Sequence, residues 1–561
     1  MKVIIKDYHS ITGLNLRENF LNSPFQFETM IIGIHDGHDA GAVLIDGEKI
    51  YAVNEERLNR VKKYRGFPEL SLKKVLEMAQ ATPEDIELIA VAGIFRKRSR
   101  LLELEANLKA IFGNEFKRKI LFVEHHLAHS ASAYYTSGWR EALALSIDAA
   151  GDGLSSSIYI GRDGEMIRIS QSTYLDSLGD FYASITELLG FKPMRHEGKV
   201  MSLAAYGEPT YDLSNIIELN GLSFDNKLGL IGVEATKKLA ELFSYPLSKA
   251  KEIALQMKKG SLEGEIQRKA IEIAASAQKH LEELVDELGI KLTEYGLPLA
   301  YAGGVAQNVK ANAVLRAHFP DIWVFPAMDD GGLALGAALF VKAQFERLDG
   351  KWKPFKLEHV YLGPSYDEEQ IETVLKEEGV KYEEVGDVPS FVADSLVEGR
   401  LVGYFQGAME YGPRALGNRS ILADPRDEGV KKKLNVALNR DVFQPFAPSM
   451  LEERIDEYLE DAYPNKFMTM SYMATERMIE EAPAVVHIDG TTRPQTLTNE
   501  DNLRYYEIIK RFEKATGVGI VLNTSFNMHG EPIVCSPQDA LKSFRKAKLD
   551  ILVLESFVIH F

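Results

Sequence analysis

The sequence predicts an α/β protein with a duplicated N-terminal domain and a second α/β domain behind it. Residues 30–56 and 143–169 share one plan: an apolar strand, a polar glycine turn, a second strand, an Asp-Gly turn and a third strand. Segments with helical spacing lie between and after these two units. The repeat is far longer than a solenoid period, so it indicates two sister subdomains.

Further elements follow from local patterns. Helical spacing predicts helices near 71–80 and from 267 onward, with Gly289 as the C-cap of the second helix. The stretches 298–308 and 324–343 each read as a short apolar strand, a glycine turn and a helix. Such turns leave backbone N–H groups free to hold phosphate.

Chain length sets the domain organisation. A chain of 561 residues exceeds one hydrophobic core. The charged, proline-containing stretch 345–369 places a boundary near residue 350. We therefore expect an N-terminal extension over 1–29, a first domain over 30–350 and a second α/β domain over 351–561. In the second domain, 411–427 reads as an Arg-rich loop and 517–534 as a buried strand entering a polar loop.

Composition limits the function classes. Acidic residues number 82 against 65 Lys plus Arg, a net charge of −17, which argues against a nucleic-acid surface. Cys535 is the single cysteine, so an intramolecular disulfide is impossible and a reducing compartment is indicated. No signal peptide core and no membrane-length apolar run is present. We expect a cytoplasmic protein with no nucleic-acid or membrane partner.

A histidine pair is the first candidate site. His125 and His129 are four residues apart in "EHHLAHSASAYY" and share one face of a helix, whereas His126 points elsewhere. Two imidazoles at this spacing either hold a metal or form an ordinary helix face. Asp148 and the pair Asp329/Asp330 end apolar strands at glycine turns. They either complete a mixed ligand set suited to Fe, Mn or Zn or act as turn formers.

Glycine turns supply a second kind of candidate site. Gly151, Asp152 and Gly153 lie in the turn of the second unit, facing the corresponding turn of the first, and could hold the phosphates of a nucleotide. Three residues of the stretch 298–308 could contact the base or ribose of that nucleotide: Gly303, Gly304 and Asn308.

Polar side chains suggest two further roles. His38 could perform acid–base work with Asp36 as the carboxylate that orients it, or could be a turn histidine. Lys199, before a small-residue helix, could reach a phosphate or acyl oxygen or lie on the surface. The second domain carries a set of arginines and polar residues suited to phosphate oxygens: Arg414, Arg419, Arg426, Arg440, Asn523, Ser525 and Asn527.

Eight motifs in order, from about residue 30 onward, carry a family resemblance. They are "HDAGAVL", "HHLAHSASAYY", "EGKVMSLAAYG", "GGVAQN", "DDGGLALGAAL", "GPRALGNRSILADPR", "FQPFAPSML" and "NTSFNMHGEPIV". This set resembles the NodU/CmcH-type O-carbamoyltransferases. The resemblance implies an actin/Hsp70/sugar-kinase-like N-terminal domain of the threonylcarbamoyl-transfer kind, followed by a YrdC-like domain.

The resemblance also implies a two-step reaction and its cofactors. Carbamoyl phosphate and ATP would give carbamoyl-adenylate in the C-terminal domain, and the carbamoyl group would pass to a hydroxyl of a small acceptor at an N-terminal metal site. The implied cofactors are ATP with Mg²⁺ and a divalent metal, iron by resemblance, with manganese or zinc also open. The acceptor and the oligomeric state stay open, with a homodimer among the alternatives.

Individual roles follow motif by motif. The implied metal ligands are His125, His129, Asp148 and Asp330. Asp36 and His38 are the implied acceptor-activating residues, and Lys199 is kept beside them as a candidate catalytic residue. Arg414, Arg440, Asn523 and Ser525 are expected on the carbamoyl-phosphate side.

One departure from the family pattern concerns that side. Leu438 stands where the family pattern has lysine, and Gln444 where it has arginine. Losing two cations at a dianion site would cost several kcal/mol, at roughly 1.5–3 kcal/mol for each charged hydrogen bond. Either neighbours such as Arg440 compensate, the same fold uses a different acyl donor, or the chain is a non-enzymatic nucleotide-binding module.

Overall fold

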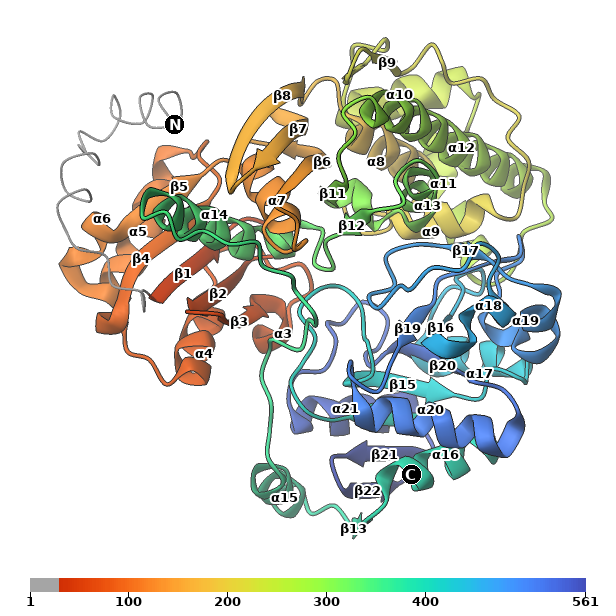
Figure 1. The fold of residues 1–561 in the computed structure, drawn as a ribbon. Coiled ribbons are helices and arrows are strands. Elements are labelled where there is room, and N and C mark those ends of the chain that lie inside the picture. Colours follow the sequence, from red (N-terminus) through yellow and green to blue (C-terminus); the bar gives the residue numbers. More distant parts are fainter. Residues whose placement is uncertain (1–29) are drawn as a thin grey trace.

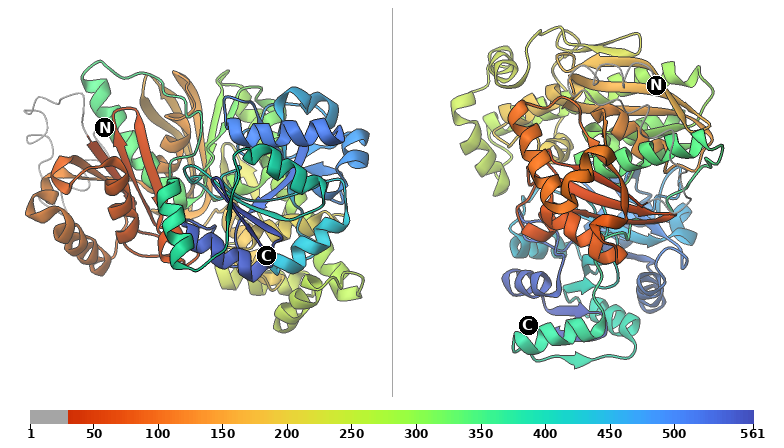
Figure 2. Two further views of the ribbon diagram at one scale, coloured as in Figure 1. Left: turned by 90° about the horizontal axis from the view of Figure 1, so that it is seen from below. Right: turned by 90° about the vertical axis from the view of Figure 1, so that its left-hand side faces the viewer.

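The computed structural model of the protein describes residues 30–561 (Figure 1). The expected extension over 1–29 lies outside the described residues. The described chain forms two similar N-terminal subdomains and a C-terminal α/β domain. Figure 2 shows from two other sides how these parts lie against one another.

The first subdomain is built on a five-stranded sheet in the order β3-β2-β1-β4-β5. Its strands are β1 (Met30–His35), β2 (Gly41–Asp46), β3 (Lys49–Asn54), β4 (Ile86–Ala92) and β5 (Ile120–Val123). β1, β2 and β3 form an antiparallel meander, and β4 and β5 continue parallel to β1. The predicted meander over 30–56 is confirmed.

The second subdomain repeats this sheet. Its order is β8-β7-β6-β11-β12, again with a meander and two parallel strands. The strands are β6 (Glu141–Gly151), β7 (Leu154–Arg162), β8 (Glu165–Thr173), β11 (Leu299–Ala302) and β12 (Ile322–Val324). Two successive sheets of the same order confirm the expected duplication and the α/β class, while the actin/Hsp70/sugar-kinase-like assignment stays a prediction.

Two helices fill the space between the sheets. α7 (His125–Tyr134) packs on the second sheet, α14 (Leu333–Leu348) packs on the first, and the helices pack on each other. Their close approach requires glycine: a Cβ at Gly336 would lie 1.9 Å from the carbonyl oxygen of Ala128. Alanine and other small residues of both helices, all buried, form the core of this layer.

The remaining N-terminal helices lie outside the layer of α7 and α14, some packed on the sheets and others on neighbouring helices (Figure 1). On the first subdomain they are α3 (Glu55–Asn59), α4 (Glu69–Ala79), α5 (Arg98–Phe112) and α6 (Phe116–Lys119). The helices of the second subdomain are α8 (Leu178–Leu188), α9 (Glu197–Ala204), α10 (Gly232–Leu242), α11 (Ala250–Lys258), α12 (Glu265–Thr293) and α13 (Val309–His318). A small hairpin joins β9 (Glu218–Asn220) to β10 (Ser223–Asp225).

The C-terminal domain is built on an eight-stranded mixed sheet in the order β13-β22-β21-β14-β15-β20-β16-β19. The strands are β13 (Glu383–Glu384), β14 (Val402–Phe405), β15 (Arg419–Ala423), β16 (Ala447–Leu451), β19 (Gln495–Leu497), β20 (Ile520–Ser525), β21 (Ile551–Leu554) and β22 (Phe557–His560). A second hairpin pairs β17 (Tyr472–Met473) with β18 (Thr491–Thr492). The predicted second α/β domain is therefore present, while its YrdC-like character and the boundary near 350 stay predictions.

Helices pack on this sheet and around its edges (Figure 1). They are α15 (Glu368–Glu377), α16 (Val388–Val397), α17 (Gly429–Leu438), α18 (Ile455–Tyr458), α19 (Glu476–Glu481), α20 (Leu503–Thr516) and α21 (Pro537–Ala547). Within residues 30–561, no helix is both long and apolar enough to cross a lipid bilayer.

Two sequence predictions about elements are wrong. Gly289 does not end a helix, because α12 continues to Thr293. The glycine serves packing instead: a Cβ there would lie 3.0 Å from His318 Cδ2 on the neighbouring α13. The stretch 411–427 is not all loop either, because Arg419–Ala423 forms the fully buried strand β15.

Candidate active site

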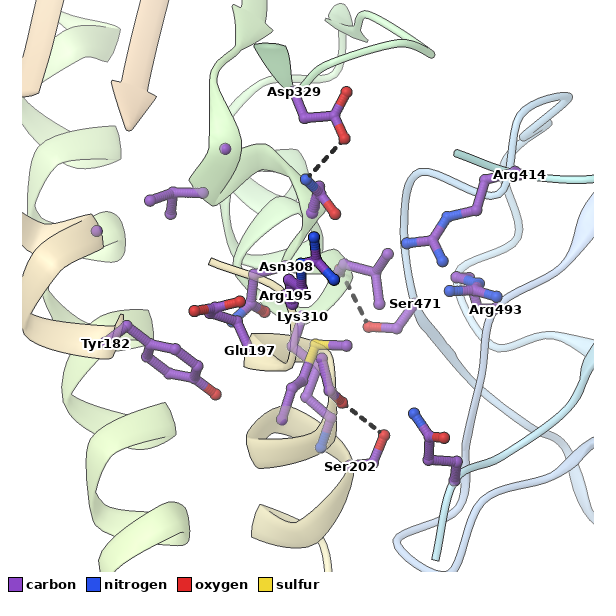
Figure 3. A pocket seen from close by; sticks show the side chains of 18 of the residues that line it. Tyr182, Arg195, Glu197, Ser202, Asn308, Lys310, Asp329, Arg414, Ser471 and Arg493 are labelled. Carbon is purple, nitrogen blue, oxygen red and sulfur yellow. Dashed lines mark hydrogen bonds between the residues drawn. The ribbon is translucent and has the colours of Figure 1, made fainter. Parts of the chain in front are cut away.

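A cavity of about 330 Å³ lies where the two N-terminal subdomains meet the C-terminal domain, with His38, Asp39 and Lys63 of the first subdomain on its wall. α8, α9 and the start of α13 supply its N-terminal wall, and loops before β15, β16 and β19 supply the opposite wall. Figure 3 shows Arg414 and Arg493 on the C-terminal wall, across the cavity from Tyr182 and Glu197. The cavity joins two groups of charged residues, a histidine–aspartate cluster and an arginine cluster.

The histidine–aspartate cluster contains the four residues implied as metal ligands. Ligand atoms of His125, His129, Asp148 and Asp330 all lie within 4.8 Å of one another, and all four residues are buried. His125 Nε2 lies 3.1 Å from Asp148 Oδ2, and His129 Nε2 lies 3.3 Å from Asp330 Oδ1. Asp148 and Asp330 also line the cavity. Residues distant in sequence thus converge at one point.

Local structure explains the convergence. Glu124 caps α7 by accepting the backbone N–H groups of His126 and Leu127, which fixes the helix start and directs His125 and His129 to one face. Asp148 lies in β6 where the ladder to β7 becomes irregular, between Ile147 and Gly151. Asp330 begins the turn that leads into α14. The packing of α7 on β6 and on α14 therefore brings the two carboxylates to the histidines.

The imidazoles and carboxylates of the cluster shift one another's pKa values. Burial favours neutral Asp148, but hydrogen bonds and charge from His125 and His129 outweigh it and hold the pKa of Asp148 well below its ordinary value. Burial likewise opposes protonation of His125, yet Asp330 and Asp148 raise the pKa of His125 to about 9. The same carboxylates raise the pKa of His129. The pocket thus favours positive charge.

These residues fit a divalent cation. Two imidazoles and two carboxylates are a common donor set for Fe, Mn and Zn. His129 Nε2 is buried and lies 3.5 Å from Asp148 Oδ2 and 3.3 Å from Asp330 Oδ1 without a well-aligned hydrogen bond to either, which suits a metal-ligating atom. His126, by contrast, turns away to contact the Ser146 hydroxyl, as expected from the helical spacing. Its pKa is lowered to about 3 by burial.

His38 lies beside the cluster and lines the cavity. Its Nε2 is 3.1 Å from Asp330 Oδ2, and its Nδ1 is 3.1 Å from Asp39 Oδ2. The charge of Asp330, followed by contact with Asp39, raises the pKa of His38 to about 9 against the effect of burial. Lys63 pairs with Asp39 at 3.3 Å and also lines the cavity.

The prediction that Asp36 orients His38 is wrong. Both oxygens of Asp36 accept hydrogen bonds from Arg96 Nη1, at 2.6 and 2.5 Å, and the pair is buried. Asp36 does not line the cavity. The carboxylate beside His38 is Asp39, three residues after Asp36.

The arginine cluster consists of Arg414, Arg440 and Arg493, which line the cavity from the C-terminal domain. Within residues 30–561, none of the three makes an ion pair with a carboxylate, and the Nε atoms of Arg414 and Arg493 lack hydrogen-bond partners. Burial lowers the pKa of Arg414 and of Arg440 to about 10. Gathering such charges is unfavourable unless an anion offsets them.

Arg493 was missed by sequence reasoning. Burial, with repulsion from Arg414 and Arg440, lowers its pKa well below the ordinary value. The Asp489-Gly490 turn stands just before it in "DGTTRPQ" and is a signal that could have found it, although no neighbouring arginine reinforces that signal. Asp329 was considered only as a ligand, but its side chain faces the cavity (Figure 3), and burial and Asp39 raise its pKa to about 6.

The glycine turn predicted to hold a nucleotide is structural instead. The Asp152 carboxylate accepts the backbone N–H groups of Ile94, Phe95 and His125. A Cβ at Gly151 would lie 2.1 Å from the His125 ring, so this glycine makes room for a cluster histidine. Gly151, Asp152 and Gly153 do not line the cavity.

The second predicted nucleotide set is divided. Gly304 and Asn308 line the cavity, and the Gly304 N–H approaches Asp148 Oδ1 at 3.3 Å. Gly303 lies behind them, packed against Ile147 backbone with a φ of +102°. Asn308 caps α13 with its side chain.

Two residues expected on the carbamoyl-phosphate side also lie elsewhere. Asn523 is buried and donates to the Ala415 carbonyl and the Ser449 hydroxyl. Neither Asn523 nor Ser525 lines the cavity, because β20 is an interior strand whose polar groups bond to its neighbours.

Two positions that depart from the family pattern differ in placement. Leu438 is 1% exposed within the hydrophobic core and does not face the cavity, whereas Gln444 lines it. Arg493 brings the number of cavity-lining guanidiniums in the cluster to three. The prediction that two cations are missing from the anion site is therefore wrong at position 438, because this position does not face the cavity.

Lys199 does not line the cavity, so its expected catalytic role is not supported. It is buried, and its ammonium pairs with Asp441 of the C-terminal domain at 2.7 Å. Burial lowers its pKa despite that partner.

The fold and the two charged clusters define an α/β enzyme with a metal-type cluster and an anion pocket in one cavity. Residues 95–339 match the family described as carbamoyltransferase N-terminus, and residues 393–560 match carbamoyltransferase C-terminus. The chain belongs to the carbamoyltransferase family and is a carbamoyltransferase, so the resemblance found in the sequence is confirmed.

Relatives span nearly the whole chain. It is 40% identical over 545 residues to an uncharacterized protein, MJ1051, of Methanocaldococcus jannaschii, covering 94% of this chain and 99% of that protein. It is 36% identical to nodulation protein NolNO of Sinorhizobium fredii, covering 97% of this chain and 81% of that protein. A solved structure of full-length HypF with phosphate and nucleotide bound shares 15% identity over 57% of this chain and 47% of that one, at a TM-score of 0.37, which is too low to argue from.

Proposed function

We propose that this carbamoyltransferase makes carbamoyl-adenylate from carbamoyl phosphate and ATP and passes the carbamoyl group to a hydroxyl of a small acceptor. The net equation of the first step is that carbamoyl phosphate, ATP and water give carbamoyl-adenylate, phosphate and pyrophosphate. The observation that supports this most is the single cavity that holds three unpaired arginines at one wall and the histidine–aspartate cluster at another.

The arginine cluster suits the first step. Guanidinium groups bind phosphate oxygens in bidentate fashion, and three of them can offset the charge of a carbamoyl phosphate dianion beside a nucleotide. No different acyl donor is needed, because Leu438 does not face this site and Arg493 does. The wall formed by Gly304 and Asn308 is where we place the nucleotide.

The histidine–aspartate cluster suits the second step. His125, His129, Asp148 and Asp330 would hold a divalent cation. When bound, that cation would polarise the carbamoyl carbonyl and offset the carboxylates that raise the pKa of His38. We assign His38 to take the proton of the acceptor hydroxyl, because it lines the cavity and Asp39 orients it.

In the transfer, the acceptor oxygen attacks the carbamoyl carbon. The new carbon–oxygen bond forms as the bond to the adenylate phosphate oxygen breaks, and AMP leaves. Asp329 and Lys63, both cavity residues, flank the approach to His38 and would exclude or order water there.

The test is direct. Purified protein is incubated with ATP and carbamoyl phosphate across a series of Fe²⁺, Mn²⁺ and Zn²⁺, and pyrophosphate and carbamoyl-adenylate are measured. We expect both products, with pyrophosphate release dependent on carbamoyl phosphate. Absence of both products under every metal would overturn the proposal.

A further inference from the structure

We propose that Lys199 is a positioning residue: its ion pair with Asp441 fixes the 440–446 loop and so holds the Arg440 guanidinium at the anion-binding wall of the cavity. This inference rests on the proposed function, since it assumes that the arginine cluster binds carbamoyl phosphate. It assigns to Lys199 a role that needs no contact with substrate.

The ion pair crosses between the two halves of the protein. Lys199 belongs to α9, whose residues Glu197 and Ser202 line the cavity (Figure 3). Its own side chain is 8% exposed and points to the 1% exposed carboxylate of Asp441. Removing one partner of such a buried pair leaves an uncompensated charge, so the pair ties the loop firmly.

The same loop carries Arg440 and Gln444 among its residues of the cavity wall. Arg440 precedes Asp441 directly, and Gln444 donates its backbone N–H to the Asp441 carbonyl at 3.1 Å. Arg440 is itself aimed by a hydrogen bond from Nη1 to Thr524 Oγ1 at 2.8 Å and by the Phe446 ring, 4.7 Å away. A shift of Asp441 would therefore move both cavity residues.

Other contacts from the N-terminal half hold the loop less tightly. Lys258 of α11 lies 3.7 Å from Asp441 Oδ1, and its carbonyl is 3.4 Å from the Val442 nitrogen. The Phe443 ring meets Phe191 edge-on at 6.2 Å. Lys199 makes the shorter of the two ion pairs with Asp441, at 2.7 Å against 3.7 Å for Lys258, so we assign the positioning to it.

The experiment measures equilibrium binding of carbamoyl phosphate and, separately, of ATP by calorimetry. For Lys199→Met we expect carbamoyl phosphate affinity to fall at least tenfold while ATP affinity changes less than twofold, and we expect Lys199→Arg to recover most of the loss. Lys62→Met is the matched control: it removes another lysine contact between the halves, Nζ to the Glu531 carbonyl at 3.2 Å, away from the 440–446 loop. It should leave both affinities unchanged.

A double variant tests whether Lys199 acts through Arg440. If it does, Arg440→Met weakens carbamoyl phosphate binding less in the Lys199→Met background than in the wild type. Independent, additive losses would overturn the proposal, as would wild-type affinity in Lys199→Met. If Lys199→Met folds poorly, Lys199→Met/Asp441→Asn removes both charges together; wild-type affinity in that variant would overturn the proposal too.

The proposed function fails in a different way. Wild-type protein that binds no carbamoyl phosphate would contradict the anion site itself. If the wild-type protein binds carbamoyl phosphate and Lys199→Met binds it equally well, only the positioning role is contradicted.

Discussion

At the residue scale, neighbouring side chains decide what each functional group can do. His125 and His126 are adjacent in sequence, yet the first faces two carboxylates and the second faces Ser146. Their pKa values accordingly move in opposite directions, to about 9 and about 3. The same residue type is thus a ligand candidate at one position and a neutral core residue at the next.

This contrast gives a matched pair of variants. His125→Ala removes one of four converging ligands, and we expect it to lose most of the bound metal, measured as metal per protein after purification and dialysis. His126→Ala removes a buried histidine from the same helix and should keep stoichiometric metal, even if it lowers stability. Equal retention by both variants would show that the cluster is not the metal site.

Metal affinity should also depend on pH. Because the pKa of His125 is about 9 without metal, the residue is protonated below that pH and a cation must displace the proton. Affinity should therefore fall as pH decreases below 9, by up to about tenfold per unit for each proton released. Calorimetry in buffers of different ionisation enthalpy counts those protons. Binding without proton release would contradict the assignment of His125 as a ligand.

Arg493 tests the anion site. Arg493→Met removes one of three unpaired guanidiniums from the cavity wall, and a charged hydrogen bond contributes about 1.5–3 kcal/mol. Carbamoyl phosphate should bind roughly tenfold or more weakly by that estimate, with the thermal midpoint of unfolding maintained or raised because like charges are relieved.

Arg419 is the control for that variant. It is fully buried and donates to backbone carbonyls, including those of Gln406 and Asn418, rather than to the cavity. Arg419→Met should lower stability without a selective effect on carbamoyl phosphate affinity. If both variants lowered stability and affinity together, the distinction between an anion-binding and a structural arginine would fail.

At the element scale, close packing of α7 on both β6 and α14 brings the ligands together. The sequence patterns predicted both three-strand meanders and the strand–turn–helix units because each carries its own glycine and alternation signals. They misplaced the end of α12, since a glycine required for helix–helix contact looks locally like a C-cap. Whether such a glycine ends a helix or makes room for a neighbouring helix depends on tertiary packing, which local patterns do not encode.

The crossing at Gly336 offers a test at this scale. Gly336→Ala would place a Cβ against the Ala128 carbonyl, and overpacking of this kind costs about 1–3 kcal/mol. We expect a lower free energy of unfolding and weaker metal binding, because α7 carries the histidine pair. Gly386→Ala has open space around its Cβ and should be neutral in chemical denaturation. Unchanged stability in Gly336→Ala would contradict the packing argument.

At the scale of the whole molecule, the chain folds so that one cavity joins groups from both halves. The motifs identified the family and all four cluster residues, because those residues lie in dense, unusual patterns. They did not find Arg493, and they misassigned Asp36, Lys199 and Asn523, because the contacts of a lone polar residue depend on partners hundreds of positions away. The partners of a side chain at a domain interface are therefore decided by the assembled fold and not by its neighbours in the sequence.

The most direct test of the account is a crystal structure of the metal-loaded protein soaked with ATP and carbamoyl phosphate. We predict an anomalous peak for one cation between His125, His129, Asp148 and Asp330, and phosphate density against Arg414, Arg440 and Arg493 in the same cavity. A cation bound elsewhere, or phosphate density away from the arginine cluster, would contradict the account.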